Sequence, residues 1–298
     1  MSSTNPCLVI GATGLVGADV AHRLRERGRE VRALVRGDLQ RPAAQSLSQA
    51  GVQLLAGDLR DAAAIARACA NIATIVCTAT AMPHASGDAL QQVDHDGVLA
   101  LISAAEQAGV RRFVYTSFSG NIRTDSPLAR AKRDCEARLA RSPLESAVLR
   151  PSFFMQVWLG PRLGFDVQQG KVRIFGDGSA PVSYVSSGDV AAFAVAAVTR
   201  EGELHEVIDI GGPAPLSQLE AVATFERLTG RRLERQHVPM TALEEQHRSP
   251  DPLQRTFAAL MIACALGDSI PEAQRVAQHF GVQLTSLEDF ARQSQRAL

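Results

Sequence analysis

A direct passage from an apolar segment through a glycine-rich turn into a helix sets the strongest constraint on this chain. Cys7-Leu8-Val9-Ile10 reads as a buried strand, and Gly11-Ala12-Thr13-Gly14-Leu15-Val16-Gly17 follows it at once. In such a turn the first glycine permits the tight bend, the second lets the backbone approach a pyrophosphate, and the third lets the helix pack on the strand. Phosphates would bind the free N–H groups at the helix N-terminus. The turn therefore predicts a dinucleotide site, with a structural turn that has lost its ligand as the alternative. Its expected members are Gly11, Thr13, Gly14, Leu15, Val16 and Gly17.

Short apolar segments alternate with helical patterns along the first half of the chain. The helical segments place apolar residues on one face and stop at a glycine, as 15–27 does at Gly28 and 98–108 does at Gly109. Strands separated by helices indicate a parallel sheet covered on both faces, so we predict an α/β fold with a Rossmann-type doubly wound parallel sheet. The expected strands are 7–10, 31–35, 52–55, 72–77, 113–117 and 147–149.

The pattern becomes less regular after Pro151. It predicts a smaller C-terminal α+β lobe, so the expected division is a dinucleotide-binding domain at 1–150 and a substrate lobe at 151–298 that is partly interleaved with the first. The substrate is expected in a crevice beyond the carboxyl ends of the strands. The expected strands here are 172–175, 182–185, 206–210 and 233–238, and the expected helices are 187–199, 217–229, 252–266, 271–280 and 286–295.

Charge and cysteine usage exclude several classes of protein. Lys plus Arg and Asp plus Glu each number 31, so no net charge attracts nucleic acid or an anionic membrane. The five cysteines form no C-x-x-C pair, which argues against a disulfide framework and a metal site. We see neither a signal peptide nor an apolar run long enough to span a bilayer, and we expect a cytoplasmic protein.

The segment after the second expected strand bears on the choice of dinucleotide. An enzyme that prefers NAD carries an acidic residue there for the ribose 2′-hydroxyl, whereas this chain has Arg36. A guanidinium suits a 2′-phosphate, so NADP(H) is favoured over NAD(H); a solvated surface arginine is the alternative. After the third strand, Asp58 and the adjacent Leu59 are expected to border the adenine, and Asp58 as a helix N-cap is the competing interpretation.

Four stretches together resemble the NmrA-like group of atypical short-chain dehydrogenase/reductases. They are 11–17, 31–36, Ala108-Gly109-Val110-Arg111-Arg112-Phe113-Val114-Tyr115-Thr116-Ser117 and Leu149-Arg150-Pro151-Ser152-Phe153-Phe154-Met155. The resemblance covers about residues 7–210. It implies an NAD(P)H-binding protein from a family that includes quinone reductases, triphenylmethane-dye reductases, isoflavone-reductase-like enzymes and catalytically silent redox sensors.

The resemblance also implies further site residues. Thr78 and Ala79 would line the cofactor, and Thr116 and Ser117 would face the nicotinamide. Lys132 matches the family's lysine and would hold the nicotinamide ribose and act in catalysis together with Ser117, with a solvated helix lysine as the alternative. The positions expected to approach the nicotinamide ribose or amide are Pro151 and Phe153.

One departure from the family of short-chain dehydrogenases matters for chemistry. These enzymes place a tyrosine four residues before the lysine as a proton donor, and Leu128 stands there. Tyr115 lies within a strand, where alternation directs it away from Thr116 and favours a core role. The usual Ser-Tyr-Lys relay is therefore not expected.

Other candidates are weaker. His84, in the loop 79–94, could donate a proton, with a merely solvated histidine as the alternative. Asp189 is expected to cap a helix. The large side chains at 153–158 could line a pocket that accepts an aromatic ligand, or they could pack in the core. We expect core packing for at least two of them. They are Phe153, Phe154, Met155 and Trp158.

These inferences favour an NADPH-dependent oxidoreductase that reduces a small molecule such as a quinone or conjugated carbonyl by hydride transfer. The alternative is a non-catalytic NADP(H)-binding redox sensor that acts through a protein partner. No nucleic acid or membrane is expected as a partner, no metal is expected, and a homodimer stays open.

Overall fold

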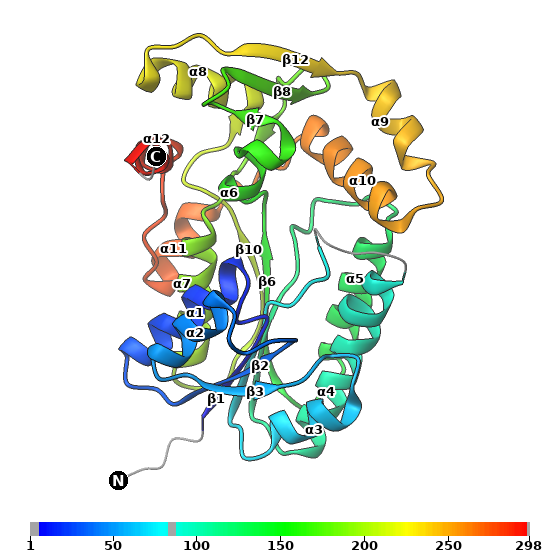
Figure 1. Ribbon diagram of the computed structural model, residues 1–298, viewed down its shortest axis with the longest axis vertical. Helices are drawn as coiled ribbons and strands as arrows, with labels where there is room; N and C mark the ends of the chain where they lie inside the picture. Colours follow the sequence, from blue (N-terminus) through cyan, green and yellow to red (C-terminus); the bar gives the residue numbers. More distant parts are fainter. Residues whose placement is uncertain (1–5, 83–87, 297–298) are drawn as a thin grey trace. The chain divides into compact units, whose positions relative to one another are not determined.

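The computed structural model describes residues 6–82 and 88–296 (Figure 1). The chain forms two compact units, each built from separate segments. The first unit comprises Met1–Ser117, Pro127–Leu149 and Ala191–Ile208, and the second comprises Phe118–Ser126, Arg150–Val190 and Asp209–Leu298.

A seven-stranded sheet with the order β10-β6-β5-β4-β1-β2-β3 is the centre of the first unit. The ladders that join β6, β5, β4, β1, β2 and β3 are parallel, which confirms the predicted Rossmann-type sheet. Ile10 pairs with Leu34 on one side and Cys77 on the other, so the strand ends align at one edge. The strands are β1 (Cys7–Ile10), β2 (Val31–Val35), β3 (Gln53–Ala56), β4 (Thr74–Cys77), β5 (Arg112–Thr116), β6 (Glu145–Pro151) and β10 (His205–Ile210).

Helices cover both faces of this sheet, with α1, α2 and α7 on one side and α3, α4 and α5 on the other (Figure 1). The helix expected at 98–108 is α4, which begins at Val98 as expected and directly follows a π-helix, η1 (Leu90–Gly97). The glycines expected to end α1 and α4 have φ +71° and +68°, the left-handed conformation of a helix stop. The helices are α1 (Leu15–Glu26), α2 (Pro42–Gln49), α3 (Ala62–Cys69), α4 (Val98–Gln107), α5 (Pro127–Leu139) and α7 (Ser187–Thr199).

A buried arginine joins the amino end of β5 to the end of α7. Arg112 is fully buried, and its guanidinium donates to Glu145 Oε2 at 2.7 Å and to four nearby backbone carbonyls. These carbonyls belong to Ala197, Val198, Arg200 and Gly202. The guanidinium thereby satisfies carbonyls at a helix C-terminus, where a positive charge is also favoured by the helix dipole.

The second unit contains two small sheets. In one, β8 (Lys171–Phe175) lies between β7 (Phe165–Asp166) and β12 (Glu234–Val238); in the other, β9 (Pro181–Val182) pairs with β11 (Leu216–Ser217). The strand expected at 182–185 is therefore shorter, and Val185 makes only an isolated bridge to Phe154. The helical segments are α6 (Met155–Trp158), η2 (Pro161–Leu163), α8 (Gln218–Thr229), α9 (Met240–His247), α10 (Pro252–Leu266), α11 (Ala273–Phe280) and α12 (Leu287–Arg296).

Two aspartates stabilise loops of the second unit. Asp189 lies in the first turn of α7, at the helix end where it was expected, and its carboxylate accepts the Thr285 N–H at 2.8 Å and the Thr285 hydroxyl at 2.7 Å. Asp268 is 1 % exposed and accepts hydrogen bonds from Ser119 and Ser152 at 2.7 Å and from Asn121 at 2.9 Å. Asp268 thus ties the segment that follows β5 to the segment that follows β6.

All five cysteines are buried and unpaired. Burial raises the pKa of Cys7, Cys135 and Cys264 to about 12 and that of Cys69 and Cys77 to about 11, from an ordinary value of 9.0. These thiols stay protonated, and hence weakly nucleophilic, while the protein is folded.

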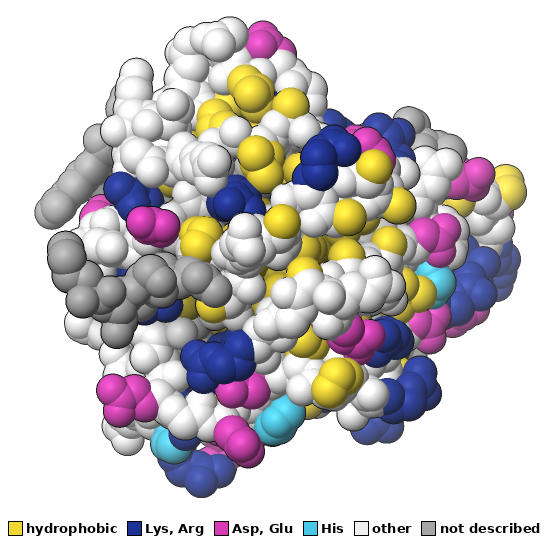
Figure 2. Space-filling view, turned by 90° about the horizontal axis from the view of Figure 1, so that it is seen from below, with side chains coloured by type: hydrophobic (Ala, Val, Ile, Leu, Met, Phe, Trp, Pro, Cys, Tyr) yellow, Lys and Arg dark blue, Asp and Glu magenta, His cyan; other side chains and the backbone are white. Residues whose placement is uncertain are grey.

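The surface mixes charges of both signs. On the face shown in Figure 2, Lys and Arg side chains lie next to Asp and Glu side chains. Within the described ranges, no helix is long and apolar enough to cross a membrane.

Candidate functional site

The turn between β1 and α1 contains backbone contacts that only glycine permits. Gly11 has φ +83°, and a Cβ on it would lie 2.8 Å from both Ala79 N and Thr78 Oγ1. A Cβ on Gly17 would overlap the Gly11 carbonyl oxygen. The Gly14 N–H donates to that same carbonyl at 2.9 Å, which closes the turn. The backbone of the turn at the carboxyl end of β1 therefore stays uncovered by side chains at its glycines.

Thr78, directly after β4, is hydrogen-bonded to the strand end from which this turn starts. Its N–H donates to the Ile10 carbonyl at 2.9 Å and its hydroxyl donates to the same carbonyl at 3.2 Å. Thr78 and Ala79 thus shape the glycine turn, and their contact with a cofactor stays a prediction.

The first turn of α1 is open to an anion. Gly14 is the N-cap and provides no side-chain cap, and no acidic residue follows in the first turn. Leu15 is 51 % exposed, whereas Val16 is buried against the core. Uncapped N–H groups at the positive end of a helix suit a phosphate.

Two arginines lie beyond the end of β2. Arg36 is exposed, which fits both a residue that meets a ligand and a solvated surface arginine, so its role stays a prediction. Arg41, which sequence reasoning missed, is half-buried and donates from Nη2 to Thr13 Oγ1 at 3.3 Å. Its Nε is buried and has no hydrogen-bond partner among the described residues. The only sequence signal for Arg41 is a second arginine immediately before Pro42, where α2 begins.

Asp58 is paired with an arginine of its own loop. Arg60 Nη2 lies 2.8 Å from Asp58 Oδ2, and its hydrogen bonds lower the pKa of Asp58 below the ordinary value, with a smaller contribution from Arg36. The N-cap of α3 is Asp61, so the competing cap interpretation of Asp58 is wrong. Leu59 is buried, and its Cβ would lie 2.9 Å from a Cβ on Gly97.

α5 carries Lys132 into the interior. Lys132 is 5 % exposed, so the solvated-lysine alternative is wrong. Its Nζ donates to the Thr116 carbonyl at 3.2 Å and lies 3.7 Å from Asp94 Oδ1 and 5.0 Å from the centroid of the Tyr115 ring. A carboxylate and an aromatic face thus compensate the buried ammonium.

Two polar atoms beside Lys132 lack hydrogen bonds. Thr116 Oγ1 and Asp94 Oδ1 are buried, and neither has a hydrogen-bond partner in the described parts of the chain. The other Asp94 oxygen accepts the Ala81 N–H at 2.8 Å. Buried polar atoms are normally satisfied by protein, water or ligand, so this cluster has spare hydrogen-bonding capacity. Asp94 was not recognisable from sequence because its contact depends on the register of η1 against α5.

Ser117 has a partner that sequence reasoning also missed. Its hydroxyl donates to Glu136 Oε1 at 2.5 Å, and Arg133 Nη1 donates to the same oxygen at 2.6 Å. Leu128, Lys132 and Glu136 follow one another at intervals of four residues and are all buried on one face of α5. Leu128 therefore stands where the tyrosine of short-chain dehydrogenases would precede the lysine, and Glu136 stands one turn after it.

The predicted core role of Tyr115 is confirmed. It is fully buried, and burial raises the pKa of its phenol well above the ordinary value, so it is a poor acid. The described residues bring no group of three His, Cys, Asp or Glu side chains together for a metal ion.

The predicted aromatic wall belongs to the second unit. Phe153 is 3 % and Met155 1 % exposed, and both lie in the hydrophobic core, as expected for at least two members. The ring centroids of Phe153 and Trp158 are 4.6 Å apart in an edge-on contact. Contacts of Pro151 and Phe153 with a cofactor stay predictions, and His84 lies outside the described residues.

The sheet and its glycine turn define a Rossmann-type α/β protein. The sequence pattern of the NmrA-like family matches residues 3–290, and the chain belongs to this family of atypical short-chain dehydrogenase/reductases.

Known relatives have different functions. The chain is 31 % identical over 238 residues to the photosystem II assembly factor Ycf39 of Guillardia theta, an alignment that covers 79 % of this chain and 74 % of that protein. It is 30 % identical over 226 residues to the NAD(P)H azoreductase of Xenophilus azovorans, with 75 % and 74 % covered. Its fold is similar to that of the NADPH-dependent quinone oxidoreductase QOR2 of Escherichia coli, with TM-score 0.77, 19 % identity and 96 % and 99 % covered.

Proposed function

We propose that this protein is an NADPH-dependent reductase of a small conjugated acceptor such as a quinone. One observation carries the proposal. The buried Lys132 ammonium lies beside two unsatisfied polar atoms, Thr116 Oγ1 and Asp94 Oδ1, in a sheet whose carboxyl edge also carries an uncapped glycine turn. That combination provides phosphate binding and a charged, desolvated site in one unit.

The residues present fit a dinucleotide. The glycine turn leaves its backbone bare, and the N-terminus of α1 offers uncapped N–H groups to a pyrophosphate. Arg36 and Arg41 would hold a ribose 2′-phosphate, which favours NADPH over NADH; Arg41 Nε has no hydrogen-bond partner in the part of the chain that the structure describes.

When bound, the nicotinamide supplies a hydride. The protein's own task is then to orient the reactants and to stabilise charge that develops on the acceptor oxygen. Lys132 Nζ, fixed by the Thr116 carbonyl and Asp94, is the buried positive charge available for this. Ser117 Oγ, whose proton is donated to Glu136, presents its lone pairs as an acceptor to a ligand N–H or O–H.

The class of hydride acceptor follows from the missing proton donor at the site. Leu128 replaces the phenol donor, and the phenol of Tyr115 is too weak an acid to substitute for it. A quinone needs less assistance from a protein acid than a simple ketone does, because hydride transfer to it yields a resonance-stabilised hydroquinone monoanion. The names of the azoreductase and the quinone oxidoreductase support a conjugated acceptor.

The same departure supports a second candidate, a dinucleotide-binding sensor that acts through a protein partner. Leu128 removes the usual proton relay without affecting the glycine turn, and a relative is named as an assembly factor. Under this candidate the protein binds the dinucleotide without turnover.

Calorimetric titration with NADPH and NADH, followed by NADPH oxidation in the presence of a quinone series, tests both candidates. Tight NADPH binding with turnover is the result expected of a reductase; tight binding without turnover selects the sensor.

Gly14→Asp should abolish binding, because a carboxylate would occupy the phosphate approach. Ala66→Asp, which places the same carboxylate at an exposed position of α3, is the matched control and should bind normally. Binding of NADPH by Gly14→Asp would refute the phosphate-loop assignment.

A further inference from the structure

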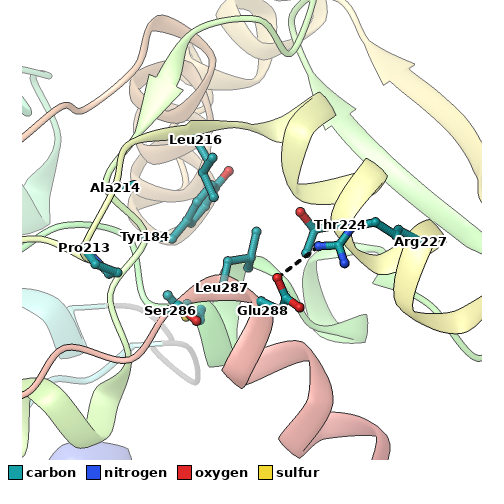
Figure 3. Close-up of a pocket in the computed structure, with 10 residues that line it drawn as sticks. Tyr184, Pro213, Ala214, Leu216, Thr224, Arg227, Ser286, Leu287 and Glu288 are labelled. Atoms are coloured by element: carbon teal, nitrogen blue, oxygen red, sulfur yellow. Dashed lines mark hydrogen bonds and ion pairs between the residues drawn. The ribbon is translucent and has the colours of Figure 1, made fainter.

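The second unit contains a cavity that the dinucleotide site does not use. Its volume is about 210 Å³, and all of its lining residues belong to this unit (Figure 3). One part of the lining is apolar and includes Met155, Tyr184, Leu216 and Leu287. Met155, Tyr184 and Leu287 are 1 %, 3 % and 5 % exposed, so the apolar part belongs to the hydrophobic core.

The opposite part of the lining is charged. Arg227 of α8 pairs with Glu288 of α12, with 3.1 Å between Nη2 and Oε2, as the dashed line in Figure 3 marks. In that view, Leu287 lies between this pair and the Tyr184–Leu216 side. A ligand in the cavity would therefore meet apolar surface at one end and a guanidinium at the other.

The ion pair across the rim is exchangeable. The side chain of Arg227 is 59 % exposed and that of Glu288 38 % exposed, and pairs so exposed contribute little to stability. Glu288 also has a second partner, because Arg292 donates to its Oε1 at 2.5 Å. If an incoming anion bound the Arg227 guanidinium, the negative charge of Glu288 would thus remain paired with Arg292.

Other polar groups in the lining are already engaged. The Ser286 hydroxyl donates to Asp289, and the Thr224 hydroxyl donates to the Glu220 carbonyl. The Tyr184 hydroxyl lies 3.9 Å from Cys264 Sγ. The guanidinium of Arg227 is consequently the strongest recognition group that the cavity offers to a ligand.

We propose that this cavity binds a monocyclic aromatic carboxylate, with its ring against Tyr184, Leu216 and Leu287 and its carboxylate on Arg227. The size supports one ring, since an apolar cavity of about 150 Å³ holds benzene. A planar guanidinium matches a carboxylate through two parallel hydrogen bonds. No residue of the dinucleotide site takes part, so the proposal is independent of the reductase function.

Titration of the full chain with benzoate, monitored by calorimetry and by saturation-transfer NMR, tests this site. Benzoate should bind at least ten-fold more tightly than benzamide, its neutral counterpart of the same size. Arg227→Gln should remove that preference, and Leu216→Phe should weaken both ligands because it fills the cavity. Arg275→Gln is the matched control, because this arginine has a 79 % exposed side chain and lies outside the lining, and it should leave benzoate affinity within two-fold.

Several outcomes would overturn the proposal. Absence of saturable benzoate binding, equal affinity for benzamide, or unchanged affinity in both Arg227→Gln and Leu216→Phe would each do so, provided that the variants retain the wild-type unfolding temperature. Gly14→Asp separates the two sites: it should lose NADPH and keep benzoate. Loss of both ligands in Gly14→Asp would place benzoate in the dinucleotide site and contradict the assignment.

Discussion

Two arginine side chains are expected to decide which dinucleotide the proposed site prefers. Arg36 reaches solvent after β2, while Arg41 contacts the hydroxyl of Thr13 within the glycine turn. The second arginine therefore connects the segment that would read a 2′-phosphate with the turn that would hold the pyrophosphate. Selectivity for NADPH should depend on both residues.

Arg36→Ala and Arg41→Ala should each weaken NADPH about ten- to a hundred-fold, the value of a charge-assisted hydrogen bond of about 1.5–3 kcal/mol. NADH, which lacks the phosphate, should change less than three-fold. Calorimetric titration of both cofactors measures the difference. An equal loss of NADPH and NADH would remove the 2′-phosphate assignment.

Lys132 should act on the reaction more than on the fold. Because Met at this position would leave Asp94 as an unpaired buried carboxylate, the informative variant is Lys132→Met combined with Asp94→Asn. Its kcat for quinone reduction should fall about 10²–10³-fold, as for loss of a group that stabilises developing charge. Lys171→Met, a lysine with a 57 % exposed side chain, is the control. Unchanged kcat in the double variant would exclude a catalytic role for Lys132.

Much of the fold was predictable at the level of elements. Periodicity and glycine stops gave β1, β2, α7 and α10 with their observed bounds, because these segments combine a clear hydrophobic pattern with a defined end. The π-helix before α4 and the short helix α9 were not predictable, because neither has a distinctive pattern. Similarly, the glycine turn is a local motif, whereas the contacts of Asp94, Glu136 and Arg41 depend on how separate elements pack.

Arg112 fixes the sheet to α7, and its loss should be costly for stability. Arg112→Met would leave Glu145 and four carbonyls without their buried partner, so the free energy of unfolding should fall by about 3–5 kcal/mol. Arg111→Met removes a neighbouring arginine whose side chain is 56 % exposed and which also pairs with Glu145, and it should cost about 1 kcal/mol or less. Denaturant titration compares them. Equal losses would show that the buried network is not the source of stability.

On the scale of the whole molecule, the buried thiols report on unfolding. Cys7, Cys69, Cys77 and Cys135 lie in the first unit and Cys264 lies in the second. In native buffer a thiol reagent should modify none of them rapidly, and in rising denaturant mass spectrometry of each cysteine should show whether the two units unfold together. Rapid modification of any cysteine without denaturant would contradict the burial described above.

The same thiols predict a loss of stability in alkali. The folded state keeps their protons up to a pKa of about 11–12, whereas the unfolded chain releases them near the ordinary value of 9.0. The free energy of unfolding should therefore fall as the pH rises above 9, since the unfolded state then binds fewer protons. Thermal unfolding between pH 8 and 11 measures this. Replacement of Cys69 and Cys77 by alanine should reduce the slope.

The interleaving of the two units has a consequence for biosynthesis. The sheet of the first unit includes β10, which is made only after the chain has passed through a long segment of the second unit. During translation, the edge of β6 therefore stays without its neighbouring strand until residue 210 has left the ribosome, and an early product ending near residue 150 exposes that edge. A nascent chain of this length should therefore be prone to aggregate through the exposed edge, and no single cut in the gene yields the first unit intact, because that unit is built from three separate segments.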